Sequence, residues 1–131
     1  MKANVPISLG ELLDKISILE IKNKKILNKS KNLNIKKELK GLKNVLSGLG
    51  INLSETNKLY SELYKINLTL WEIEDSIRVR EKNEDFGEKF IELARSVYMT
   101  NDQRFEVKNN INKLFNSEYV EEKSYEAYKK K

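Results

Sequence analysis

Acidic side chains on two expected helices are the first residues in this sequence that could do chemistry. Glu11 and Asp14 form an E-x-x-D pair near the start of the chain, and Glu72 and Asp75 form a second pair with Glu74 between them. If the two segments are antiparallel helices, their carboxylates converge into an oxygen-rich site of the kind that binds Mg²⁺ or Mn²⁺. Asp14, Glu74 and Asp75 are therefore candidate catalytic residues, and the same three with Glu11 are candidate metal ligands.

The same acidic residues also have a structural interpretation. Glu11 can cap a helix, and Glu74 can pair with Arg78 four residues later. All-helical nucleotide pyrophosphohydrolases carry close E-x-x-E pairs on facing helices, and this sequence has none at these positions. The spacing favours the structural interpretation, so we expect no cofactor, with Mg²⁺ as the alternative.

A second candidate site lies within the stretch LWEIEDSIR. One helical stripe beside an apolar seam carries Asn67, Trp71, Glu74 and Arg78. Burying an unpaired polar group there costs on the order of 2–7 kcal/mol, so these groups must be paired. One interpretation is a Glu74–Arg78 ion pair with Trp71 packed over the arginine stem. The alternative is the wall of an anion-binding pocket, and the four candidate ligand-binding residues are then Trp71, Arg78, Arg95 and Arg104.

Composition excludes several classes of protein. The 131 residues include no cysteine and no histidine, which excludes disulfide scaffolds, Cys/His zinc sites and Ser–His catalysis. The net charge is +5, but 21 of the 25 basic residues are lysines interleaved with acids, so nucleic-acid binding is disfavoured. No apolar run approaches a membrane span of about 20 residues, and we expect a cytoplasmic protein that contacts no membrane.

Helix signals recur along the chain, and they predict the elements that position these residues. Ser8–Glu11 reads as a capping box at the start of the first helix. The polar stretch Lys29–Asn32 is either a break or part of one longer helix, and Gly48–Gly50 ends the second apolar run. The next helix, from Ser54 to Lys82, carries an unbroken a/d seam of six residues: Leu59, Leu63, Ile66, Leu70, Ile73 and Ile77.

The long helix is expected to fold back on the N-terminal helices as an antiparallel hairpin. Two shorter helices follow, separated by a break at Met99–Asn101, where Thr100 and Asn101 are capping residues. The sequence thus predicts a single all-α domain over residues 1–131, a helical bundle built on a long hairpin with two shorter C-terminal helices. Residues 1–7 form an N-terminal arm, and residues 116–131 form a charged tail that contains tyrosines.

Three stretches together resemble a family of short bacterial and phage helical proteins that is classed only as a domain of unknown function. They are VPISLGELLDKISILEIKNK at residues 5–24, LWEIEDSIRVREKNEDFGEKFIELARSVYMTNDQR at residues 70–104, and VEEKSYEAY at residues 120–128. The segment Lys25–Leu53 lies outside the resemblance. The resemblance implies a prokaryotic or viral source and implies no activity or site residues.

The function expected from the sequence is that of a small helical interaction or assembly module. The second stripe beside the seam of the long helix needs a further neighbour, so we expect a homodimer. The alternative is a small helical-bundle enzyme acting on a phosphorylated or carboxylated metabolite, with or without Mg²⁺. Nucleic-acid binding is the third choice.

Overall fold

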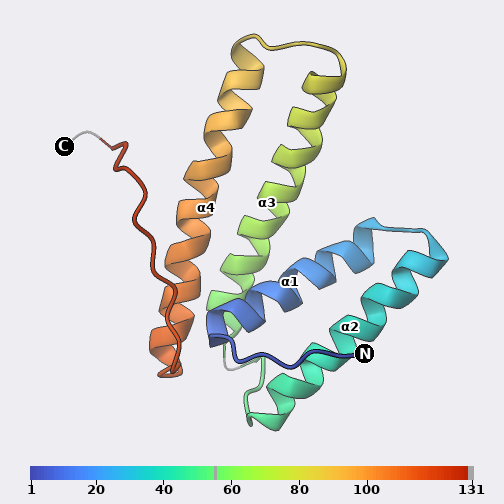
Figure 1. Ribbon diagram of the computed structural model, residues 1–131, viewed down its shortest axis with the longest axis vertical. Coiled ribbons are helices and arrows are strands. Elements are labelled where there is room, and N and C mark those ends of the chain that lie inside the picture. The colour runs from blue at the N-terminus through green and yellow to red at the C-terminus, as the bar shows by residue number, and fades with distance from the viewer. Residues whose placement is uncertain (55, 130–131) are drawn as a thin grey trace.

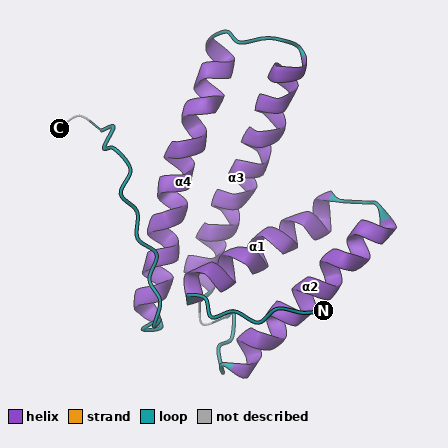
Figure 2. Ribbon diagram, in the orientation of Figure 1, coloured by secondary structure: helices purple, strands orange, loops and turns teal. Residues whose placement is uncertain are grey.

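The computed structural model describes residues 1–54 and 56–129, and these form four α-helices with no strand among them (Figures 1 and 2). The helices are α1 (Leu9–Lys25), α2 (Lys29–Gly48), α3 (Asn57–Lys82) and α4 (Glu88–Leu114). The all-α prediction is confirmed. None of the described helices is long and apolar enough to cross a membrane.

Helix α1 is the centre of the fold, because it packs against each of the other three helices. The Ser8 hydroxyl accepts a hydrogen bond from the Glu11 backbone N–H at 3.1 Å, as the predicted cap requires. The Glu11 side chain does not complete the capping box and instead contacts Lys108 of α4. Five apolar residues of α1 are buried: Leu12, Leu13, Ile16, Leu19 and Ile21.

The close packing of α1 on α4 depends on Gly10. Its backbone N–H donates to Asn112 Oδ1 at 2.6 Å, and a Cβ at this position would lie 2.4 Å from the backbone oxygen of Lys108. No other residue type fits here without moving one helix away from the other. The short distance between α1 and α4 determines the positions of the polar side chains that lie between these two helices.

The predicted pairing of the long helix is wrong. Figure 1 shows that α3 forms an antiparallel hairpin with α4, whereas α1 and α2 form a second hairpin, and α1 crosses both α3 and α4. In the predicted seam, Leu63 and Ile73 are buried, whereas Leu70 and Ile77 are only half-buried. The apolar spacing fixed the face of α3 but did not identify the helix that covers it.

The predicted break at Met99–Asn101 is also wrong, because α4 is one continuous helix of 27 residues rather than two shorter ones. Thr100 is buried in this helix, and Asn101 accepts a long hydrogen bond from Arg104 at 3.5 Å. Asp102 pairs with Lys123 of the C-terminal tail. Thr100 and Asn101 resemble a helix cap in sequence, but both lie inside the continuous helix.

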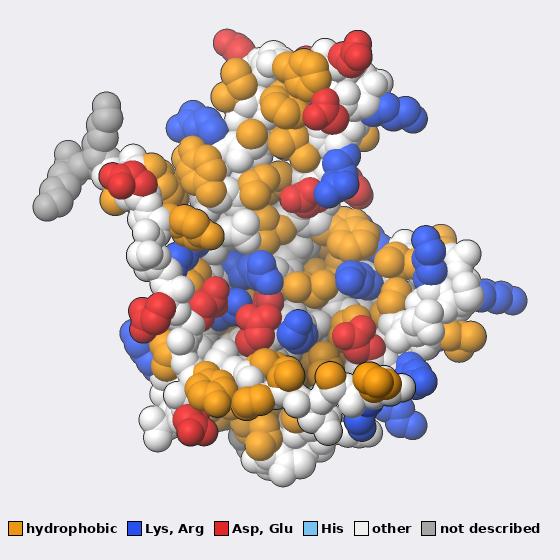
Figure 3. All heavy atoms as spheres, in the orientation of Figure 1, with side chains coloured by type: hydrophobic (Ala, Val, Ile, Leu, Met, Phe, Trp, Pro, Cys, Tyr) orange, Lys and Arg blue, Asp and Glu red, His pale blue; other side chains and the backbone are white. Residues whose placement is uncertain are grey.

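The upper part of the α3–α4 hairpin projects beyond α1 and α2 (Figure 1). We call residues 70–99 the distal hairpin. Ile73 is its only buried apolar residue, and four large ones are exposed: Val79, Phe86, Ile91 and Tyr98. Figure 3 shows apolar side chains along this part of the molecule with acidic and basic groups at its edges.

Candidate functional site

The Asp14 carboxylate is the centre of a polar network at the junction of α1, α3 and α4. Its side chain is 1% exposed. Oδ1 accepts hydrogen bonds from Asn67 Nδ2 at 2.8 Å and from Arg104 Nε at 2.9 Å, and Oδ2 contacts Arg104 Nη2. Asn67 also donates to Ser17 Oγ at 2.7 Å. Both Asp14 oxygens therefore have protein partners, and these partners come from α3 and α4.

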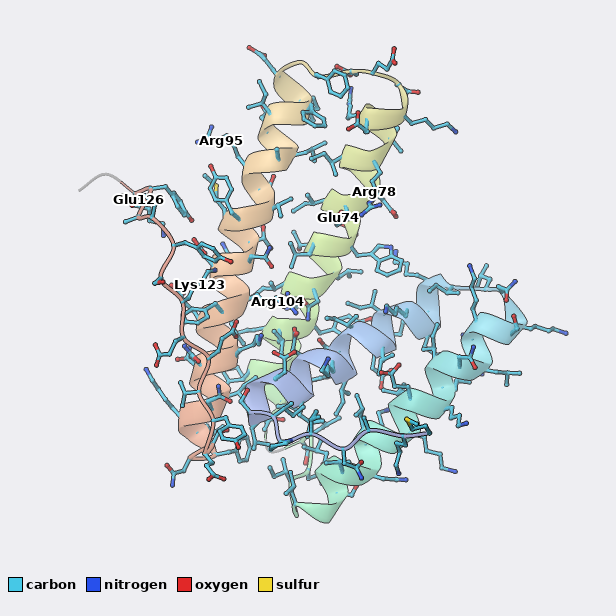
Figure 4. All side chains as sticks on the ribbon, viewed as in Figure 1. Glu74, Arg78, Arg95, Arg104, Lys123 and Glu126 are labelled. Carbon is cyan, nitrogen blue, oxygen red and sulfur yellow. The ribbon has the colours of Figure 1, made fainter. Side chains whose placement is uncertain are left out.

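The guanidinium of Arg104 is fixed edge-on by this carboxylate. Hydrogen bonding to Asp14 raises the pKa of Arg104 above its ordinary value, against the opposing effect of burial. The Arg104 side chain is 27% exposed, so one part of it reaches the surface of the junction. Figure 4 shows Arg104 where α1, α3 and α4 meet.

A second charged network joins α1, α4 and the C-terminal tail. Lys108 Nζ lies 2.8 Å from both Glu11 Oε2 and Glu121 Oε2. Burial lowers the pKa of Lys108, but the hydrogen bonds with these two carboxylates raise it above its ordinary value. Lys108 thus stays charged and links the first helix to the tail.

The tail is held along α4 by further contacts. Lys123 Nζ lies 2.6 Å from Asp102 Oδ1 and 5.4 Å from the centre of the Phe105 ring. The Tyr98 and Tyr128 rings meet edge to face at 5.0 Å. Hydrogen bonds from Lys123 and Tyr128 lower the pKa of Asp102. Between the tail and α4 these contacts enclose a cavity of about 460 Å³, which Arg104 and Lys108 line.

A second cavity of about 430 Å³ lies in the angle between α1 and the distal hairpin. It brings together five residues proposed from the sequence: Trp71, Glu74, Asp75, Arg78 and Arg104. The Glu74–Arg78 pair forms at 3.2 Å as expected, and its side chains are 47% and 78% exposed. Its high exposure means that this pair contributes little to stability and that its groups remain accessible to a ligand.

The remaining sequence candidates lie apart from this cavity. Arg95 is exposed and points away from the hairpin (Figure 4). Glu11 contacts Lys108, and Asp14 lies behind Arg104, so these carboxylates do not converge with Glu74 and Asp75. Within residues 1–54 and 56–129, no three acidic side chains are grouped closely enough to hold a metal ion.

Three important residues were not among the sequence candidates: Asn67, Lys108 and Lys123. Asn67 had a visible signal, because it is a polar residue on a stripe beside the buried seam of α3. Lys108 and Lys123 had none, because each is one lysine among 21. Their partners come from distant parts of the chain, and only the fold identifies them.

The geometry defines a small all-helical protein whose charged groups are paired at a three-helix junction and along a tail. The model of a family of unknown function, DUF6165, matches residues 1–129, and the chain belongs to that family. No curated protein and no solved structure matches the chain.

Proposed function

We propose that this chain is a helical interaction module that forms a homodimer, in which the tip of each distal hairpin packs on the α1–α2 turn of the other copy. The observation that carries the proposal is that these two exposed apolar surfaces have opposite charge. The setting we propose is the cytoplasm of a prokaryotic or phage-infected cell, supported by the family resemblance and the absence of cysteine.

The distal hairpin is the acidic surface. Residues 70–99 include five basic and eight acidic side chains, a net charge of −3 in a chain whose total is +5. At the tip, Phe86 and Ile91 are 53% and 54% exposed, and Glu84 and Glu88 are exposed around them. The tip therefore presents an apolar centre with an acidic rim.

The α1–α2 turn is the basic surface. Helix α2 contains six lysines and one glutamate, a net charge of +5. A cavity of about 350 Å³ at this turn is lined by Ile26, Leu27 and Leu33, with Lys29 and Lys36 beside them. Leu27 is 87% exposed and Leu33 is 67% exposed. The turn thus presents an apolar hollow with a basic rim.

Charge complementarity selects this pairing over the other symmetric ones. Packing tip on tip would bring two acidic surfaces together, and packing α2 on α2 would bring two basic ones together. Figure 1 shows the distal hairpin and the α1–α2 hairpin diverging as two limbs, so the tip and the turn lie at the ends of separate limbs of one copy. A two-fold axis then forms the tip-to-turn contact twice.

Light scattering after size exclusion tests the proposal. The wild-type protein should have about twice the chain mass of 15.4 kDa. Phe86→Glu at the tip and Leu27→Glu at the turn should each give monomers, because each places a charge in the apolar centre of the contact. Leu114→Glu is the matched control, since Leu114 is 57% exposed at the other end of α4.

A charge-reversal pair sharpens the test. Lys36→Glu should weaken the dimer by like-charge repulsion, and adding Glu88→Lys should restore it. A wild-type monomer at tens of micromolar, about 50 μM, would overturn the proposal, since a specific homodimer binds more tightly than this. Equal dissociation by the Leu114→Glu control would overturn the choice of surfaces.

A further inference from the structure

We infer that the cavity of about 430 Å³ between α1 and the distal hairpin is a binding site for a small monocarboxylate with a flat, apolar body. Neither family membership nor the proposed dimer assigns a ligand to it. Its volume lies within the range of ligand pockets, about 300–1,000 Å³. Figure 3 shows the molecule hollowed at this angle, with apolar and charged side chains together.

The wall of the cavity suits an apolar body. It is formed by Ile18 and Ile21 of α1 and by Leu70 and Trp71 of α3. Trp71 is half-buried, although it is the largest side chain in the protein. An indole beside aliphatic side chains offers a flat surface on which an aromatic or branched aliphatic group can pack.

Arg104 supplies a fixed donor at one end of the same cavity. Its Nε and Nη2 are held by Asp14, whereas Nη1 has only a long contact of 3.5 Å to Asn101 Oδ1. Arg104 and Asn101 both line the cavity, so Nη1 is the edge of the guanidinium that a ligand can reach. Because Asp14 already orients the arginine, binding loses little side-chain entropy.

The charges around the cavity select a monoanion. Its lining includes three basic residues (Lys22, Arg78 and Arg104) and two acidic residues (Glu74 and Asp75), and Asp14 lies behind Arg104 as a third acid. Basic and acidic groups are therefore equal in number. The cavity thus has no excess positive charge to stabilise the second negative charge of a dianion such as a phosphate ester, whereas one carboxylate can bind Arg104 while its apolar body packs on Trp71.

The protein carries its own reporter for this site, because Trp71 is its only tryptophan. We would titrate the full chain with sodium 3-phenylpropanoate, with the neutral analogue 3-phenylpropanol and with inorganic phosphate, and follow indole fluorescence. The expected result is a saturable change with the carboxylate, at an affinity at least about tenfold above that of the alcohol or phosphate. Equal or tighter binding of the alcohol or of phosphate would overturn the assignment.

Two variants locate the binding. Arg104→Lys keeps the charge but removes the planar fork, and it should lower the affinity at least about tenfold. Trp71→Phe, measured by calorimetry, should weaken binding because the flat wall is smaller. Arg95→Lys is the matched control, since Arg95 lies on α4 outside the cavity and should leave the affinity unchanged. If both site variants fold and bind the carboxylate as the wild type does, the inference is wrong.

The titration is repeated on Phe86→Glu, the variant designed to be monomeric. Every residue that the inference uses comes from one chain, so the same affinity is expected whether or not the protein associates. Absence of saturable binding to either form, up to about 10 mM carboxylate, would overturn the site while leaving the dimer proposal intact.

Discussion

Removal of the Asp14 carboxylate should be among the most damaging single substitutions in the protein. Asp14→Ala leaves the Arg104 guanidinium without its partner and leaves Asn67 Nδ2 without one of its two acceptors. Breaking a buried ion pair from one side costs about 3–5 kcal/mol. Because the Arg104 side chain is 27% exposed and can turn towards water, we expect the lower end, about 3 kcal/mol.

Urea unfolding followed by circular dichroism measures this loss, and thermal unfolding checks it. For a chain of this size, a loss of about 3 kcal/mol lowers the melting temperature by roughly 10 °C. The control is Arg95→Ala, whose exposed side chain should contribute no more than about 0.5 kcal/mol. The m-value should stay constant if only the native state changes.

A double-mutant cycle with Arg104→Ala isolates the pair itself. In the double variant neither charge is left without its partner, so its loss should be smaller than the sum of the two single losses by at least about 1 kcal/mol. Additive losses would refute the view that these two residues stabilise one another. A loss below about 0.5 kcal/mol for Asp14→Ala would refute the burial argument altogether.

Three further predictions concern other parts of the structure. Arg78→Ala should cost no more than about 0.5 kcal/mol, because the pair with Glu74 is exposed; a larger loss in urea unfolding would contradict this. Gly10→Ala should cost about 1–3 kcal/mol, since the new Cβ would lie 2.4 Å from an α4 carbonyl; an unchanged melting temperature would refute it. Hydrogen bonds from Lys123 and a tail tyrosine lower the pKa of Asp102. The contribution of Asp102 to folding stability is therefore present above its ordinary pKa, and it is lost as the pH falls through the lowered value. Amide NMR shifts of the tail should change in that acidic range, and Asp102→Asn should abolish the change.

The helices themselves could be predicted from the sequence because local signals determine them. Ser8 caps α1, and the apolar spacing of α3 places Leu63 and Ile73 on the buried face. The pairing of helices could not be predicted in this way. An apolar stripe indicates that a neighbour exists, but several helices in the chain present similar stripes, and α3 pairs antiparallel with α4 while α1 crosses it.

The candidate site was partly predicted from the sequence, and the errors of that prediction have one physical cause. Trp71, Glu74 and Arg78 do line one cavity, because residues at helical spacing share a face whatever the tertiary structure. Glu11 was interpreted through local capping, although its side chain contacts Lys108 of α4. Capping rules consider only residues a few positions apart, so they do not identify a partner that lies far away in the sequence.

The three stretches on which the family resemblance rests contact one another in the fold. Asp14 in the first contacts Arg104 in the second, and Glu121 and Lys123 in the third contact Lys108 and Asp102 of α4. The segment 25–53 lies between these stretches, within the part of the chain that the family model matches, and forms the turn and helix that supply the basic surface of the proposed dimer. The two proposals therefore use different parts of the chain: the carboxylate site is built from α1, α3 and α4, whereas the tip-to-turn contact also needs the α1–α2 turn. A variant of this chain with a substituted α1–α2 turn should thus keep the cavity and lose the dimer.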